Sequence, residues 1–279
     1  MSGLQERIGL HAWTLDTTPL ADVLRIAREA GYAAVELRYA DYERALAAGM
    51  TREQYLDMIR SSGMKVGVMG VENGLIFSEG DEREKLLASF EVSCTNAVAV
   101  GCDTLMITAG RNQPTNVKDA AANCRKGGLL AREHGLRLAL EFSAAHPFLN
   151  RLEVAREIVA LAGLPNCGLL LDTYHLHRSG AVGSGFKHVP AREIFAFQFS
   201  DVPRGPPPGG PTALDRLPPG KGDVHWLEVF GLLMEKDYGG YINYEAPNPA
   251  QWNRPAAEVA REGIMAAREL IAQAASGKR

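Results

Sequence analysis

Residues 134–142 read HGLRLALEF, a helix end followed directly by a run that is apolar almost throughout. Glycine after the last helical residue supplies the left-handed conformation that ends a helix. An apolar run without alternation is typical of a parallel strand that is covered on both faces. Two further runs of this kind are GLLLDT at 168–173 and FAFQFSD at 195–201. We therefore expect buried parallel strands that alternate with helices.

The same order of helix, glycine and strand recurs along the whole chain. Amphipathic helical patterns cover Pro19–Ala30, Arg83–Val100 and Val117–His134, and a glycine follows each of them. Eight strands are predicted, at Arg7–Leu15, Ala33–Arg38, Lys65–Val71, Asp103–Thr108, Leu136–Phe142, Cys167–Asp172, Ile194–Ser200 and Tyr241–Glu245. This pattern predicts the α/β class and a (β/α)8 TIM barrel, with residues 1–279 in a single domain. A doubly wound sheet is the alternative, but no GxGxxG follows the first strand, GLHAWTL.

The composition excludes several classes of protein. With 30 Lys and Arg against 33 Asp and Glu, the 279-residue chain has a net charge of -3, so we expect no nucleic-acid partner. A hydrophobic content of 46% is that of a globular protein, and the apolar runs are far shorter than the ~20 residues of a membrane span. The N-terminus MSGLQERIGL lacks the pattern of a signal peptide. Four cysteines without a CxxC pair predict reduced thiols in a cytoplasmic protein.

One segment, Val202–Gly222, interrupts the alternation. It reads VPRGPPPGGPTALDRLPPGKG and holds seven prolines and five glycines, so it is neither a helix nor a central strand. A flexible linker is one interpretation. However, the segment follows the seventh strand, and loops in that position build the active-site face of a barrel. We therefore expect a Pro/Gly-rich lid loop over residues 202–222.

Oxygen-bearing side chains stand at the carboxyl ends of four consecutive predicted strands. They are Glu141, Asp172, Gln198 and Glu245. A carboxylate that follows LAL or LLL is costly to bury unless it is paired or bound to metal. Three such carboxylates and an amide oxygen suit one divalent ion of the hard or borderline kind: Mg²⁺, Mn²⁺, Co²⁺ or Zn²⁺. For any one of these carboxylates considered alone, the alternative to metal binding is a role in a salt bridge or as a helix cap.

The chain resembles the xylose-isomerase-like TIM-barrel superfamily of sugar isomerases, epimerases and related lyases over essentially its whole length. The residues that carry the resemblance are LEF at 140–142, DTYH at 172–175, FQFSD at 197–201, Arg216 with PGKG at 219–222, and DYGGYINYE at 237–245. DTYHLH and DRLPPGKGDV look most like inosose isomerases and ketose 3-epimerases. Gln198 looks more like 3-dehydroshikimate dehydratases, because many epimerases have a histidine ligand there. The amide favours Mg²⁺, Mn²⁺ or Co²⁺, with Zn²⁺ as a further candidate.

The resemblance implies that Glu141 and Glu245 are the catalytic acid/base pair as well as metal ligands, with Asp172 and Gln198 completing the ligand set. A metal that chelates a ketone and a neighbouring hydroxyl acidifies the α-proton, and a carboxylate can then form a metal-bound enediolate. We expect a metal-dependent isomerase or epimerase of a keto-sugar or keto-inositol. The alternative is a metal-dependent dehydratase, a lyase acting on an inosose or on 3-dehydroshikimate.

Substrate contacts are expected from two more side chains. His175, three residues after Asp172, is placed to reach a substrate hydroxyl, or else orients a metal ligand. Arg216 in the lid can bind a substrate oxygen, or else is a solvated loop arginine. At Glu36, a contact with substrate or with a metal ligand competes with a salt bridge at the rim. Weaker candidates for the pocket are His11, Trp13, His146, Asn150 and His177.

Two other classes of function use the same barrel. An endonuclease for abasic DNA requires further histidine ligands and a basic groove, whereas strands three and four end in VEN and TAG. A barrel that only binds a sugar would not need both glutamates. The partner is therefore expected to be a small keto-sugar, an inosose or a related polyol, with neither nucleic acid nor membrane. The sequence is also compatible with a homo-oligomer.

Overall fold

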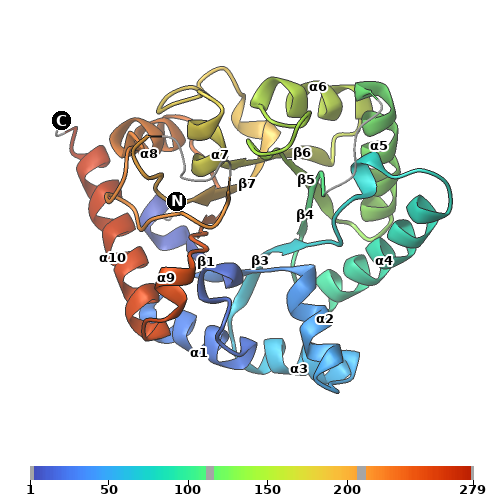
Figure 1. The fold of residues 1–279 in the computed structure, drawn as a ribbon, viewed down its shortest axis with the longest axis horizontal. Helices are drawn as coiled ribbons and strands as arrows, with labels where there is room; N and C mark the ends of the chain where they lie inside the picture. Colours follow the sequence, from blue (N-terminus) through green and yellow to red (C-terminus); the bar gives the residue numbers. More distant parts are fainter. Residues whose placement is uncertain (1–2, 111–115, 206–211, 278–279) are drawn as a thin grey trace.

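The computed structural model describes residues 3–110, 116–205 and 212–277. Eight parallel strands close into a barrel in the order of the sequence, with helices around it (Figure 1). The strands are β1 Ile8–His11, β2 Ala34–Leu37, β3 Lys65–Gly70, β4 Thr104–Thr108, β5 Arg137–Glu141, β6 Cys167–Asp172, β7 Ile194–Phe199 and β8 Ile242–Tyr244. The single-domain (β/α)8 barrel predicted from the sequence is confirmed.

The strands lie where the apolar runs predicted them and differ mainly at their ends. The first predicted strand, Arg7–Leu15, is too long, because β1 stops at His11 and a 3₁₀ helix, η2 (Ala12–Leu15), follows at once. The imidazole Nδ1 of His11 accepts a hydrogen bond from the Trp13 amide and so stabilises this turn. β8 has only three residues, so Glu245 lies immediately beyond its carboxyl end.

Helices of very different length cover the barrel. The α-helices are α1 Leu20–Ala30, α2 Tyr39–Ala47, α3 Arg52–Ser61, α4 Gly80–Ala99, α5 Val117–Glu133, α6 Leu152–Ala162, α7 Thr173–Arg178, α8 Trp226–Glu235, α9 Pro249–Trp252 and α10 Ala256–Ala275. Further 3₁₀ turns are η1 Leu4–Arg7, η3 Leu75–Phe77 and η4 Ala191–Glu193. Gly31 and Gly135 follow α1 and α5 with φ of 85° and 72°, which confirms them as helix stops. None of the helices in the described residues has the length and apolar character of a membrane span.

The barrel interior has an apolar layer below a polar one. A small cluster, separate from the main core, combines one residue from each of β3 to β7: Val68, Met106, Ala139, Leu170 and Ala196. Alternate residues of a strand point to the same side. Glu141, Asp172 and Gln198 each lie two residues beyond a member of this cluster, so they also face the interior. The apolar layer thus closes the barrel below, and the polar side chains gather at the carboxyl ends of the strands.

Candidate active site

The four residues predicted as metal ligands are all buried at the carboxyl ends of β5 to β8. Glu141 and Asp172 are the last residues of β5 and β6, and Gln198 is one residue from the end of β7. Glu245 follows β8 and donates its backbone N–H to the Phe199 carbonyl of β7. Exposure is 8% for Glu141, 4% for Glu245 and 0% for the other two. Such burial is rare for acidic groups and requires a compensating charge or a set of hydrogen bonds.

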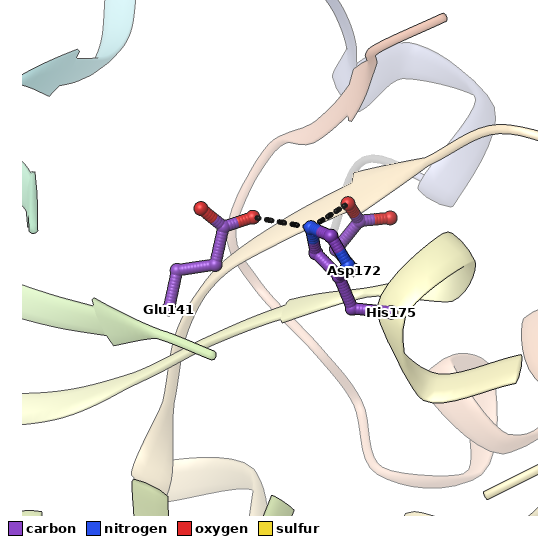
Figure 2. Close-up of side chains that lie close together, drawn as sticks. All are labelled: Glu141, Asp172 and His175. Atoms are coloured by element: carbon purple, nitrogen blue, oxygen red, sulfur yellow. Dashed lines mark ion pairs between the residues drawn. The ribbon is translucent and has the colours of Figure 1, made fainter. Parts of the chain in front are cut away.

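The turn after β6 brings His175 to two of these carboxylates. Asp172 caps α7, its Oδ1 accepting a hydrogen bond of 2.8 Å from the Tyr174 amide, and the first helical turn directs His175 back over the strand ends. Its Nε2 lies 3.9 Å from Glu141 Oε1 and 3.8 Å from Asp172 Oδ2 (Figure 2). Glu141, Asp172 and His175 each offer a ligand atom, and these atoms all lie within 4.8 Å of one another. His175 thus belongs to the group of potential metal ligands, because it lies closer to Glu141 and Asp172 than a contact with substrate alone would require.

Arg216 reaches into the site from the segment after β7. Its side chain is 1% exposed, and Nη1 donates to Asp172 Oδ2 at 2.6 Å and to Glu245 Oε2 at 3.1 Å. Its guanidinium also lies over the Tyr174 ring, 4.6 Å from the centroid, and Nη2 is 3.3 Å from His175 Nε2. The interpretation of Arg216 as a solvated loop residue is therefore wrong.

Asp201 holds the base of the same segment together. Its carboxylate accepts hydrogen bonds from the amides of Val202, Gly220 and Val224 and from the indole Nε1 of Trp226, at 2.8–2.9 Å. Both ends of the segment are thereby tied to one buried side chain. Part of the expected lid, residues 206–211, lies outside the described residues. What is described fixes the backbone beside Arg216, through paired hydrogen bonds between residues 201 and 217.

Burial and mutual repulsion shift the pKa values of the acidic groups upward. Burial raises the pKa of Glu141 well above its ordinary value, and the charges of Glu245 and Asp172 add to the rise. Burial also raises the pKa of Glu245 to about 7, although Arg216 opposes the shift. Burial lowers the pKa of His175 to about 4, against the effect of Asp172. The site thus concentrates negative charge beyond what one guanidinium offsets, which a bound cation would relieve.

Gln198 is oriented by a neighbour that is not one of the predicted ligands. Its Nε2 donates a hydrogen bond of 2.7 Å to Glu36 Oε1 on β2. Its Oε1 is buried without a hydrogen-bond partner among the described residues. Gln198 pairs with Asp172 in the sheet, and its uncommitted atom is the oxygen, as a metal ligand requires. Glu36 itself is 0% exposed, so the interpretation of this residue as a rim salt bridge is wrong.

The weaker candidates divide between the site and its surroundings. His11 belongs to the site, since its Nε2 lies 3.6 Å from Glu245 Oε1. Trp13 lies under the guanidinium of Arg38, which is 5.7 Å from the indole centroid. The remaining three contact their own loops or the outer rim: His146 Nδ1 accepts from the Leu149 amide, Asn150 donates to the Pro147 carbonyl, and His177 Nε2 lies 3.7 Å from Asp223.

Sequence reasoning missed Asn243, whose side chain is fully buried inside the barrel. Its Nδ2 donates a hydrogen bond of 2.7 Å to Glu36 Oε2. The signal was present, because Asn243 lies two residues before Glu245 and so shares its side of the chain. A three-residue strand gives too little alternation to recognise this from the sequence.

Comparison with known proteins places this geometry in a family. The family model described as "Xylose isomerase-like TIM barrel" matches residues 24–270. The chain belongs to the xylose isomerase-like TIM barrel family. The resemblance inferred from the sequence motifs is thereby confirmed.

Several relatives of this xylose isomerase-like barrel are distant in sequence but match most of its length. An inosose isomerase of Halalkalibacterium halodurans is 26% identical over 258 residues, 89% of this chain and 90% of the relative. A crystal structure of the IOLI protein with a bound zinc atom superposes with a TM-score of 0.79 at 21% identity, covering 98% of this chain and 99% of that one. L-ribulose 3-epimerase gives a TM-score of 0.75 at 18% identity, covering 97% and 96%. The two structures share the fold.

Proposed function

We propose that this protein is a divalent-metal-dependent isomerase or epimerase of an inosose or a related keto-sugar. The observation that carries the proposal is the burial of Glu141, Asp172 and Glu245 around one arginine at the carboxyl ends of the strands. A chain-length relative named inosose isomerase supports the substrate class, and a zinc-bound structure of the same fold supports the metal.

The residues proposed to hold the ion are Glu141, Asp172, Gln198 and Glu245. They fit one in part: Glu141 and Asp172 offer ligand atoms within 4.8 Å of each other, Arg216 bridges Asp172 to Glu245, and the Gln198 oxygen lacks another partner among the described residues. Four oxygen donors favour Mg²⁺, Mn²⁺ or Co²⁺, while the proximity of His175 Nε2 keeps Zn²⁺ among the candidates. When bound, the metal would polarise the substrate ketone and acidify the neighbouring C–H.

The chain's own residues would then move the proton. Glu141 and Glu245 are proposed as the acid/base pair. A pKa of about 7 at Glu245 suits a group that takes up and returns a proton near neutral pH. His175, neutral because burial lowers its pKa, and the charged Arg216 are placed to bind substrate oxygens and orient the reacting carbon. Residues 202–222 are proposed to form a lid that carries Arg216 and excludes water.

Proton exchange in D₂O tests this proposal directly. We expect the protein with Mn²⁺ to incorporate solvent deuterium into an inosose or keto-sugar whose molecular formula is otherwise unchanged. Glutamine at position 141 or 245 should slow the exchange by roughly 10²-fold or more, because it cannot accept the proton. A panel without exchange on any ketone, or near-normal exchange in either variant, would contradict the assignment.

The amide at Gln198 also supports a second candidate, a dehydratase of an inosose or of 3-dehydroshikimate. It would use the same abstraction of a proton but expel a β-hydroxyl group. The same experiment separates the two candidates, because loss of water produces a conjugated enone with a new ultraviolet absorbance.

A further inference from the structure

A buried polar cluster surrounds Gln198, one of the proposed metal ligands, and is not explained by the proton transfers above. Its four side chains come from β1, β2, β7 and β8 and are at most 1% exposed: His11, Glu36, Gln198 and Asn243. A buried carboxyl group is costly unless hydrogen bonds compensate it. Glu36 forms two such bonds, so its partners indicate what it does.

Both oxygens of Glu36 accept hydrogen bonds from carboxamide groups. Oε1 accepts from Gln198 Nε2 and Oε2 from Asn243 Nδ2, each at 2.7 Å. When Glu36 is ionised it can only accept, so reversing either amide would bring its oxygen against a carboxylate oxygen and the bond would be lost. Glu36 therefore determines which end of the Gln198 amide is committed and leaves the carbonyl oxygen free.

A glycine on β1 makes room for the second of these contacts. A Cβ built on Gly9 would overlap Asn243 Oδ1 far inside van der Waals distance. Gly9 is not among the positive-φ glycines, so space and not backbone conformation explains why it lacks a side chain. Because Gly9 has no side chain, the Asn243 side chain fits beside β1 and reaches Glu36.

The carboxamide of Gln198 can present either its oxygen or its nitrogen to a metal ion. A divalent cation binds the lone pair of a carbonyl oxygen, whereas the amide nitrogen has none to offer. A glutamine that rotates freely would present the wrong atom part of the time. The amide therefore requires a partner that fixes its orientation.

We propose that Glu36 is a positioning residue that holds the Gln198 carboxamide with its oxygen toward the metal, while Asn243 anchors the other oxygen of Glu36. This inference rests on the proposed function, since it requires Gln198 to be a ligand. It assigns a role to a carboxyl group on β2, away from the four proposed ligands on β5 to β8.

A double-mutant cycle in metal affinity tests the proposal. The dissociation constant of Mn²⁺ is measured by calorimetry on the full chain, freed of metal by a chelator, for the wild type, E36L, Q198L and the double variant. We expect E36L to weaken binding by ~10–100-fold, the range for residues that orient ligands. The double variant should bind no more than about twofold more weakly than Q198L alone, because Glu36 acts through Gln198.

A conservative variant separates orientation from charge. E36Q keeps one oxygen that can accept from Gln198 Nε2, and its new amide nitrogen can donate to the Asn243 oxygen once that carboxamide turns, so its affinity should stay within about threefold of the wild type. A loss as large as that of E36L would show that the charge matters and would overturn the proposal. Thermal unfolding checks that every variant is folded. If E36L does not fold, E36A replaces it, because its cavity can admit water.

The outcomes also distinguish this proposal from the function on which it rests. Normal Mn²⁺ affinity in Q198L, or no Mn²⁺ binding by the wild type, would reject the proposed ligand set itself. Normal affinity in E36L beside weak binding in Q198L would reject only the role of Glu36. Equal losses from E36L in the wild-type and Q198L backgrounds would also reject it, because Glu36 would then act by another route.

Discussion

Glu245 lies beside two basic side chains of the site, Arg216 and His11. Arg216 donates a hydrogen bond to one of its carboxyl oxygens, and His11 Nε2 lies 3.6 Å from the other. The guanidinium favours the ionised form, and burial, reinforced by the charge of Asp172, favours the protonated form. The balance keeps the pKa of Glu245 near 7, within reach of both protonation states at physiological pH.

Replacing Glu245 by glutamine should change how the stability of the metal-free protein depends on pH. The folded-state pKa of about 7 exceeds the ordinary value of 4.5. A raised carboxyl pKa contributes stability that is complete below pH 4.5 and is lost as the pH rises through 7. The unfolding free energy of the wild type minus that of E245Q should therefore fall across this interval, as measured in urea with a chelator present. The buried histidines, His11, His146 and His175, are common to both proteins, and a flat or rising difference would contradict the prediction.

At the scale of elements, the segment after β7 is organised by a single carboxylate. Asp201 accepts four hydrogen bonds from groups at both ends of the segment, and its side chain is fully buried. Gly222 is required beside it, because a Cβ there would overlap Val202 O. The position of Arg216 in the site thus depends on a contact outside the site.

Asp201→Asn should loosen this segment without altering the proposed ligands. The amide has one acceptor oxygen instead of two, so two of the four donors lose a partner, at a cost on the order of 2–5 kcal/mol. We expect a lower urea midpoint and a higher KM, with Mn²⁺ affinity within a few-fold of the wild type. R216A serves as the comparison, since it removes the proposed substrate contact directly. A variant with normal stability and normal KM would show that Asp201 does not position the segment.

The strands and the candidate site differed in how far the sequence could predict them. The runs that form β5, β6 and β7 are apolar and bounded by glycine or turn residues, so their position, and that of Asp172, followed from local pattern. The partner of Gln198 could not be predicted from local pattern, because Glu36 is 162 residues away and meets it only across the closed barrel. The sequence identifies Arg216 as a candidate. Its burial depends on the contacts of Asp201, and no local sequence pattern predicts those contacts.

At the scale of the whole molecule, the site joins parts of the chain that are remote in sequence. The proposed ligands lie on four strands, and the barrel closes only when β8 pairs with β1. An ion held by all four strands would therefore bind the folded barrel and not the unfolded chain. Metal binding and the stability of the whole barrel are linked for this reason.

Mn²⁺ should raise the melting temperature of the chelator-treated protein. At about 100 times the dissociation constant, binding to the native state adds about 2.7 kcal/mol, which corresponds to roughly 5 °C for a protein of this size. Differential scanning calorimetry measures the shift. D172A is the matched control and should show little of it, whereas an equal shift in D172A would place the binding elsewhere.

The missing side chain of Gly9 has a consequence for anyone who redesigns or compares such barrels. Asn243 occupies the volume that any larger residue at position 9 would claim. A side chain at position 9 therefore requires a change at position 243, with which it pairs across the β1–β8 seam. A relative with alanine at the first position must have rearranged the second, and with it the support of the amide on β7. Where β1 pairs with β8 and closes the barrel, the residue allowed at position 9 thus depends on the residue at position 243.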